Sequence, residues 1–200
     1  MRAGIRTRLL LTRVLGAAVL LLVLSSASQW TVRGSERVAE WLFAAGVVLA
    51  VAGFGGRAWA LSHIDGRKKR ELVRSGPYAL CRHPLYLFSF VGGLGLALAT
   101  QRLTLAVVYL ASCVLLFPAA IRIEEAWLEH RFDDYDDYRA SVPAMFPRWR
   151  QTRVEPMPID LRALGRGIFE ATAFLSVLLL LPPIAELQRA GVLPVLLVLP

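Results

Sequence analysis

The sequence has few cysteines and few charged residues, and each shortage excludes a class of protein. Only two cysteines occur in 200 residues. Cys81 lies in a basic stretch and Cys113 inside an apolar run, so a disulfide framework is not expected. Charged residues make up 19% of the chain and hydrophobic residues 56%, with a mean hydropathy of +0.52. This composition is too apolar for an ordinary soluble domain and indicates an integral membrane protein.

The chain also lacks any recognisable nucleic-acid-binding motif, although its net charge of +8 could suggest such a partner. Its basic residues lie in short loops between apolar runs. This pattern is typical of membrane topology, because cytoplasmic loops collect Lys and Arg. We therefore expect a lipid bilayer around the protein, no nucleic-acid partner and no bound metal.

Apolar runs divide the chain into segments, most of which are long enough, or nearly so, to cross a membrane. They cover residues 9–27, 38–61, 84–100, 103–121, 168–183 and 191–200. The sequence predicts an all-α, polytopic transmembrane protein with about five to six membrane helices.

The first and last apolar runs each leave alternatives open. Residues 9–27 could be a signal peptide with a cleavage-like site at Ser25-Ser26-Ala27, but further spans follow, which favours a retained helix. Residues 191–200 are too short to cross alone. They could complete a helix pair, lie at the interface or be frayed.

A very tight connection, Gln101-Arg102, joins the third and fourth runs, so these two helices are expected to be neighbours in a central hairpin. The fourth run continues past residue 121 without a break signal. We therefore expect its helix to leave the membrane and to carry Glu124 and Glu125 close to the bilayer surface.

Glycines gather in the second and third runs, as in Gly92-Gly93-Leu94-Gly95. A nucleotide-binding glycine loop would need a strand before it and a helix after it, and neither is expected here. Small residues in membrane helices usually allow close helix packing. We interpret these glycines as packing faces.

The distribution of positive charge predicts an orientation. With the N-terminus inside, the cytoplasmic segments carry 18 of the 23 basic residues. The loops around residues 62–83 and 122–167 would then both face the cytoplasm, and so would any polar site that they form.

Residues 75–86, Ser-Gly-Pro-Tyr-Ala-Leu-Cys-Arg-His-Pro-Leu-Tyr, combine a Gly-Pro turn with Arg82 and His83 just before a helix start at Pro84. Arg and His at a membrane surface are often only topology signals with extended side chains. Adjacent carboxylates at the bilayer edge, as at Glu124-Glu125, tend to need a cationic partner. Residues 132–143 add a third motif, rich in tyrosine and aspartate.

Together and in this order, these motifs resemble the isoprenylcysteine carboxyl methyltransferase family and its phospholipid methyltransferase relatives. The matching segments are Gly76-Pro77-Tyr78, residues 82–86, residues 124–128 and residues 135–143. One departure is Phe132-Asp133-Asp134-Tyr135, which is one residue shorter than the usual family segment and lacks its glycine. That leaves the local path near the acceptor in question.

The resemblance implies a helical membrane enzyme that transfers a methyl group from S-adenosyl-L-methionine to an acceptor at the membrane. The residues that it implies for cofactor binding are Leu72, Val73, Tyr78, Arg82, His83, Pro84, Leu85, Tyr86, Glu124 and Glu125. Arg82 could hold the cofactor carboxylate, because guanidinium groups bind carboxylates through two parallel hydrogen bonds. Arg122 is a candidate for attracting an anionic acceptor. No general base is named.

The expected acceptor is a membrane lipid or a lipid-modified carboxylate, thiol or amine. A small apolar thiol or amine is the alternative acceptor, and a non-enzymatic membrane protein that kept the fold is the alternative class. The predicted organisation is an N-terminal helix pair in 1–61, the motif core in 62–153 and C-terminal apolar helices in 154–200.

Overall fold

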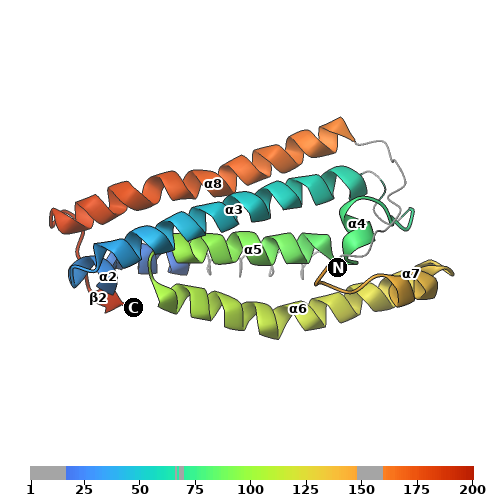
Figure 1. Ribbon diagram of the computed structural model, residues 1–200, viewed down its shortest axis with the longest axis horizontal. Coiled ribbons are helices and arrows are strands. Elements are labelled where there is room, and N and C mark those ends of the chain that lie inside the picture. The colour runs from blue at the N-terminus through green and yellow to red at the C-terminus, as the bar shows by residue number, and fades with distance from the viewer. Residues whose placement is uncertain (1–16, 66, 68–69, 148–159) are drawn as a thin grey trace.

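Four long helices run side by side along the molecule (Figure 1). The computed structural model describes residues 17–65, 67, 70–147 and 160–200. The long helices are α3 (Glu36–Ile64), α5 (Pro84–Ala99), α6 (Leu103–Arg131) and α8 (Leu161–Arg189). The shorter elements are β1 (Ser26–Ser28), α2 (Gln29–Val32), α4 (Pro77–Leu80), α7 (Tyr135–Ser141) and β2 (Leu197–Leu199). The all-α prediction is confirmed.

Three of these helices, α3, α6 and α8, are long and apolar enough to cross a membrane, and α5 is a shorter apolar helix. Residues 17–25 are also helical, whereas the earlier part of the first predicted span lies outside the described residues. The polytopic membrane fold is therefore confirmed, with four apolar helices in the described ranges.

The last apolar run does not complete a helix pair and is not frayed, and its place relative to the membrane interface stays a prediction. Residues 197–199 pair as β2 with β1 in a two-stranded parallel ladder. Gly191 ends the preceding helix with a positive φ of 72°, and Pro194 and Pro200 disfavour another helix. The end of the chain therefore pairs with β1 and lies close to α2 (Figure 1).

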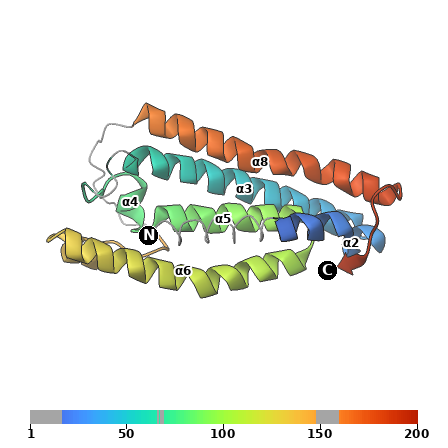
Figure 2. The ribbon, with the colours of Figure 1, turned by 180° about the vertical axis from the view of Figure 1, so that it is seen from behind.

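Helices α3 and α5 lie side by side in both views of the molecule because glycines remove the side chains between them (Figures 1 and 2). A Cβ atom on Gly53 would overlap the backbone of Gly92, and one on Gly95 would overlap the backbone of Ala50. The interpretation of these glycines as packing faces is confirmed.

Helix α8 packs along α3 on the side away from α6 (Figure 1). The rings of Phe54 and Phe174 stack with their centroids 4.8 Å apart. Asp160 caps the helix, since its Oδ1 accepts hydrogen bonds from the backbone N–H groups of Arg162 and Ala163 at 2.8 and 3.2 Å. The helix is longer than the predicted run 168–183, because it starts at this cap and continues through Pro182 and Pro183.

Helix α6 begins directly after the Gln101-Arg102 connection and continues without interruption to Arg131. Its 29 residues correspond to about 44 Å, more than a hydrocarbon core of about 30 Å. The expected extension beyond the fourth apolar run is confirmed. It brings Glu124 and Glu125 to the end of the bundle where α4 and α7 lie (Figure 1).

Candidate active site

A glycine turn directs the motif loop toward the end of the bundle. Gly76 has a φ of +59°, a conformation that side chains rarely adopt, and a Cβ atom there would also overlap the ring of His63. Pro77 then starts α4. His63 is itself fixed by Trp59, whose carbonyl oxygen lies 3.0 Å from His63 Nδ1. The loop therefore rests on the end of α3.

The motif loop is joined to the segment after α7 by two backbone hydrogen bonds. Arg82 N–H donates to the carbonyl of Pro143 at 2.8 Å, and His83 N–H donates to that of Ala144 at 3.0 Å. Arg82 and His83 are thus held in an extended pairing just before α5 begins at Pro84. Two motifs that are sixty residues apart in the sequence become neighbours.

Arg82 forms an ion pair with Glu125. Its Nε and Nη2 atoms donate to Glu125 Oε1 at 3.0 and 2.6 Å, and both side chains are nearly buried, with exposed fractions of 10% and 13%. Arg82 Nη1 also donates to the carbonyl oxygens of Val142 and Arg139 at 2.6 and 3.0 Å. One guanidinium therefore links the motif loop, α6 and the end of α7.

His83 lies between the two adjacent carboxylates. Its Nε2 is 3.1 Å from Glu125 Oε1, and its Nδ1 is 3.7 Å from Glu124 Oε2. The His83 side chain is 2% exposed, whereas that of Glu124 is 37% exposed. A tautomer with the proton on Nε2 donates to Glu125. Glu125 therefore belongs to the buried framework, and Glu124 is the carboxylate that a ligand can reach.

Two buried tyrosines of α7, Tyr135 and Tyr138, pack against this framework. Tyr138 Oη donates to the carbonyl oxygen of Tyr78 in α4 at 2.6 Å. Burial, followed by the charge of Glu125, raises the pKa of Tyr135 to about 12. Burial also raises the pKa of Tyr138 well above its usual value. Both hydroxyls stay protonated near neutral pH.

Arg74 fastens α7 to the motif loop. Its Nη2 donates to the carbonyl oxygen of Asp134 at 2.7 Å and forms an ion pair with the Asp134 carboxylate. Its guanidinium carbon also lies 5.7 Å from the centre of the Tyr138 ring, within the range of a cation–π contact. The path of the shortened family segment is thus set by Asp134.

The other predicted cofactor residues surround this core at different depths. Tyr86 places its ring 5.8 Å from that of His83 and 5.3 Å from that of Phe117 in α6. Pro84 is fully buried, Val73 packs with Tyr78, and Leu85 lies against the same cluster. Leu72 packs instead on the α7 tyrosines. Arg122 is exposed on α6.

Tyr78 provides a test of whether the site fits a polar ligand. Its side chain is 6% exposed, and its hydroxyl has no hydrogen-bond partner within the described ranges. Burial and the charge of Glu124 raise the pKa of Tyr78 far above its usual value, so the hydroxyl remains a donor. A buried donor without an acceptor and an accessible carboxylate fit a ligand with both acceptor and cationic groups, as S-adenosyl-L-methionine has.

Arg57 is a polar residue near the site that was not predicted from the sequence. It lies in α3, donates from Nη1 to Ser89 Oγ of α5 at 2.9 Å, and places Nη2 3.7 Å from Glu170 Oε2 of α8. An arginine inside an apolar run is itself a signal, because such residues are costly and usually have partners or a function. Arg57 links three helices and its charge also acts on Tyr78.

These features define a class: helical membrane proteins with a polar, partly buried site at one end of the bundle. A family model described as phospholipid methyltransferase matches residues 36–135, from the start of α3 to the start of α7. The chain belongs to this family.

The similar proteins include metal-resistance proteins and isoprenylcysteine methyltransferases. The nickel-cobalt-cadmium resistance protein NccN of Alcaligenes xylosoxydans xylosoxydans is 34% identical over 98% of this chain and 91% of its own length. The cobalt-zinc-cadmium resistance protein CzcN of Cupriavidus metallidurans is 34% identical over 94% and 86%. The mouse protein-S-isoprenylcysteine O-methyltransferase is 32% identical over 58% and 44%. No solved structure matches.

The family and the isoprenylcysteine methyltransferases among the relatives indicate a membrane methyltransferase. The family resemblance recognised in the motifs is therefore confirmed. Within the residues that the structure describes, no group of three or more His, Cys, Asp or Glu side chains could hold a metal ion.

Proposed function

We propose that this protein transfers a methyl group from S-adenosyl-L-methionine to a membrane-associated acceptor at the cytoplasmic face. The observation that carries the proposal is the convergence of Arg82, His83 and Glu125, with Glu124 beside them, at one end of the bundle. By the distribution of basic residues, this end is the cytoplasmic one.

The residues divide into those that contact the cofactor and those that hold them in place. Glu124 is assigned to the cationic or hydroxyl-bearing part of the cofactor, because its carboxylate is the accessible member of the pair. Tyr78 supplies a donor, and the ring of Tyr86, whose centre is 5.8 Å from that of His83, is assigned to the sulfonium cation. When bound, S-adenosyl-L-methionine supplies an activated methyl group on its sulfonium.

Arg82 is better placed as a positioning residue than as the principal clamp for the cofactor carboxylate. Four of its five N–H donors already have acceptors, in Glu125, Val142 and Arg139. The clamp interpretation stays a prediction. Its contacts favour a role in which Arg82 fixes Glu125 and thereby orients His83.

Methyl transfer breaks the bond between carbon and sulfur, forms a bond from carbon to the acceptor and leaves S-adenosylhomocysteine. Correct positioning can lower the barrier of such an in-line displacement substantially. A carboxylate or thiolate acceptor needs no base, so no general base is assigned. The surrounding apolar helices make the bilayer the natural route for a lipid or lipid-modified acceptor, and Arg122 is exposed where it could attract an anionic one.

The resistance proteins support a biological setting for the activity. Their similarity spans nearly the whole chain, including α8, whereas similarity to the mouse methyltransferase covers 58%. We propose that methylation by this chain contributes to resistance to divalent metals such as cobalt and cadmium. Expression of the protein in a cobalt-sensitive host should raise the cobalt concentration that the cells tolerate. Expression of the Glu124→Gln variant should leave that concentration unchanged.

Labelled methyl donor and isolated membranes test the enzymatic proposal. Membranes containing the protein should transfer label into a lipid or lipid-modified fraction, and Glu124→Gln should reduce transfer at least tenfold. Glu129→Gln is the matched control, because Glu129 lies one turn further along α6 and faces Arg139 at 3.9 Å. Equal labelling with and without the protein would contradict the proposal. Label appearing only in small soluble thiols or amines would favour the alternative acceptor class.

A further inference from the structure

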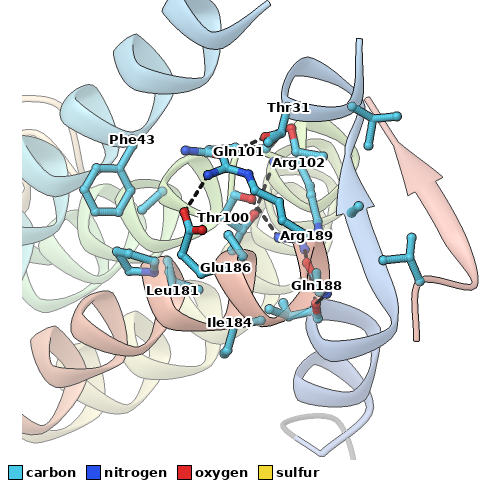
Figure 3. A pocket seen from close by; sticks show the side chains of 18 of the residues that line it. Thr31, Phe43, Thr100, Gln101, Arg102, Leu181, Ile184, Glu186, Gln188 and Arg189 are labelled. Atoms are coloured by element: carbon cyan, nitrogen blue, oxygen red, sulfur yellow. Dashed lines mark hydrogen bonds and ion pairs between the residues drawn. The ribbon is translucent and has the colours of Figure 1, made fainter. Parts of the chain in front are cut away.

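A cavity of about 520 Å³ lies at the end of the bundle opposite the candidate active site. Helices α2, α3 and α8, the end of α5 and strand β2 enclose it (Figure 3). Its volume is in the range of sites that hold small molecules. Arg102, which lines it, is 23 residues before Glu125 in the sequence, or about 35 Å along the helix axis. The cavity is therefore separate from the methyltransferase motif.

Most of the cavity wall is apolar, including Val23, Phe43, Leu181 and Ile184. The exception is a group of polar side chains near Arg102. Glu186 and Arg189 of α8 form an ion pair with each other at 2.5 Å, so their charges largely cancel. Glu40 also lines the cavity but is exposed.

Arg102 is 6% exposed and directs part of its guanidinium to backbone carbonyl oxygens. Its Nη1 donates to Thr100 O at 2.7 Å and its Nη2 to Val23 O at 3.1 Å, with a further hydrogen bond to Ser26 O. Gln188 donates to the carbonyl oxygens of Val23 and Ser26 as well. These contacts hold the place where the helical residues 17–25 turn into β1.

The carbonyl contacts leave two features of Arg102 unexplained. Its Nε–H is buried and has no acceptor within the described ranges. In the same part of the chain, no ion pair includes Arg102. A buried charge is costly without a counter-ion, and a helix C-terminus offers only a partial negative charge. Because Arg102 lines the cavity, an anion held there would supply the missing counter-ion.

We propose that this cavity binds the anionic headgroup of an amphiphile, a carboxylate or phosphate attached to an apolar chain, with the buried Arg102 guanidinium as its counter-charge. The apolar wall accommodates the chain next to the headgroup. Such a ligand can come from an anionic membrane lipid or from a free amphiphilic anion. This second site is independent of the methyl-transfer reaction.

Native mass spectrometry of the full chain in detergent tests the proposal, with phosphatidylglycerol, phosphatidylcholine and decanoate as probes. The wild type should retain phosphatidylglycerol, decanoate or both at least tenfold more tightly than phosphatidylcholine. Arg102→Gln removes the charge, and Ile184→Trp adds bulk to the apolar wall while keeping the Arg102 side chain. Each should reduce retention at least tenfold. Leu180→Trp is the control, since Leu180 lies on the same helix, is 58% exposed and is not part of the cavity wall.

Each result decides the question. Retention of phosphatidylglycerol alone assigns a lipid headgroup, and retention of decanoate alone assigns a free amphiphile. Equal retention of phosphatidylglycerol and phosphatidylcholine would overturn the proposal, as would equal retention by Ile184→Trp and the wild type. If Arg102→Gln does not fold, Ile184→Trp still decides, because Ile184 makes none of the hydrogen bonds that hold Arg102.

Discussion

Glu124 and Glu125 are neighbours in the sequence but have different environments. The Glu125 carboxylate is nearly buried and accepts hydrogen bonds from Arg82, whereas Glu124 is more than a third exposed and lies 3.7 Å from His83. One residue of separation on a helix turns the two side chains by about 100°. The same dipeptide thus supplies a structural carboxylate and an accessible one.

This difference predicts different costs of substitution. Glu125→Gln should lower the free energy of unfolding by about 3 kcal/mol, because it leaves the nearly buried Arg82 without its counter-ion. Glu124→Gln should change stability by less than about 1 kcal/mol, as is usual for partly exposed positions. Thermal unfolding in detergent measures both. Similar losses of stability in the two variants would contradict the assignment.

Gly76 is the residue on which the shape of the motif loop depends most. Gly76→Ala places a Cβ atom at φ +59° and against the His63 ring, so we expect a loss of about 1–3 kcal/mol, as for other strained backbone positions. Gly55→Ala is the matched control. A Cβ atom on Gly55 would have nothing within 4 Å, so this helical substitution should be neutral or stabilising by up to about 1 kcal/mol. Chemical denaturation of both variants in detergent provides the comparison.

At the scale of elements, the contact between α3 and α5 depends on the absence of side chains. Gly53→Val should separate the two helices, since its side chain would overlap the backbone of Gly92. Because α5 starts immediately after His83, cofactor binding should weaken together with stability, by about 2 kcal/mol or more as expected for overpacking. Gly165→Ala in α8, which has open space around it, should change neither property. If Gly53→Val bound S-adenosylhomocysteine as tightly as the wild type, the proposed dependence of the site on the α3–α5 contact would be contradicted.

The sequence predicted the elements that follow from local pattern. Apolar length marked α3, α5, α6 and most of α8, the two-residue connection marked the hairpin, and the glycine runs marked the α3–α5 contact. Pattern alone could not reveal the β1–β2 pairing, since it joins residues 26–28 to residues 197–199. It also missed the start of α8, which is fixed by the cap at Asp160 rather than by hydrophobicity.

At the candidate site, the sequence grouped the residues but did not predict how deeply each is buried. Arg82, His83, Glu124 and Glu125 were grouped by family resemblance, and the structure brings all four together. Their depth could not be predicted, because it depends on how the segment after α7 pairs with Arg82 and His83. Arg57 was missed because its partners, Ser89 and Glu170, come from two other helices.

At the scale of the whole molecule, the proposed orientation places α7 in the cytoplasm and the α8–β2 connection on the other side. Cysteines introduced at Asp133 and Val192, both exposed, should react with a membrane-impermeant maleimide from opposite sides of intact cells or inverted vesicles. Burial raises the pKa of the Cys81 thiol to about 11, so this thiol is protonated at neutral pH, and Cys113 is also buried. The native background should be low. Labelling of both positions from one side would contradict the topology.

The central claim is that the end of the bundle formed by α4, α6 and α7 binds S-adenosyl-L-methionine. Isothermal titration of the purified full chain in detergent with S-adenosylhomocysteine tests it most directly, because the measurement needs no knowledge of the acceptor. Saturable binding is predicted for the wild type and for Glu129→Gln, with at least tenfold weaker binding for Glu124→Gln. No detectable binding at millimolar ligand to folded wild-type protein would contradict the account.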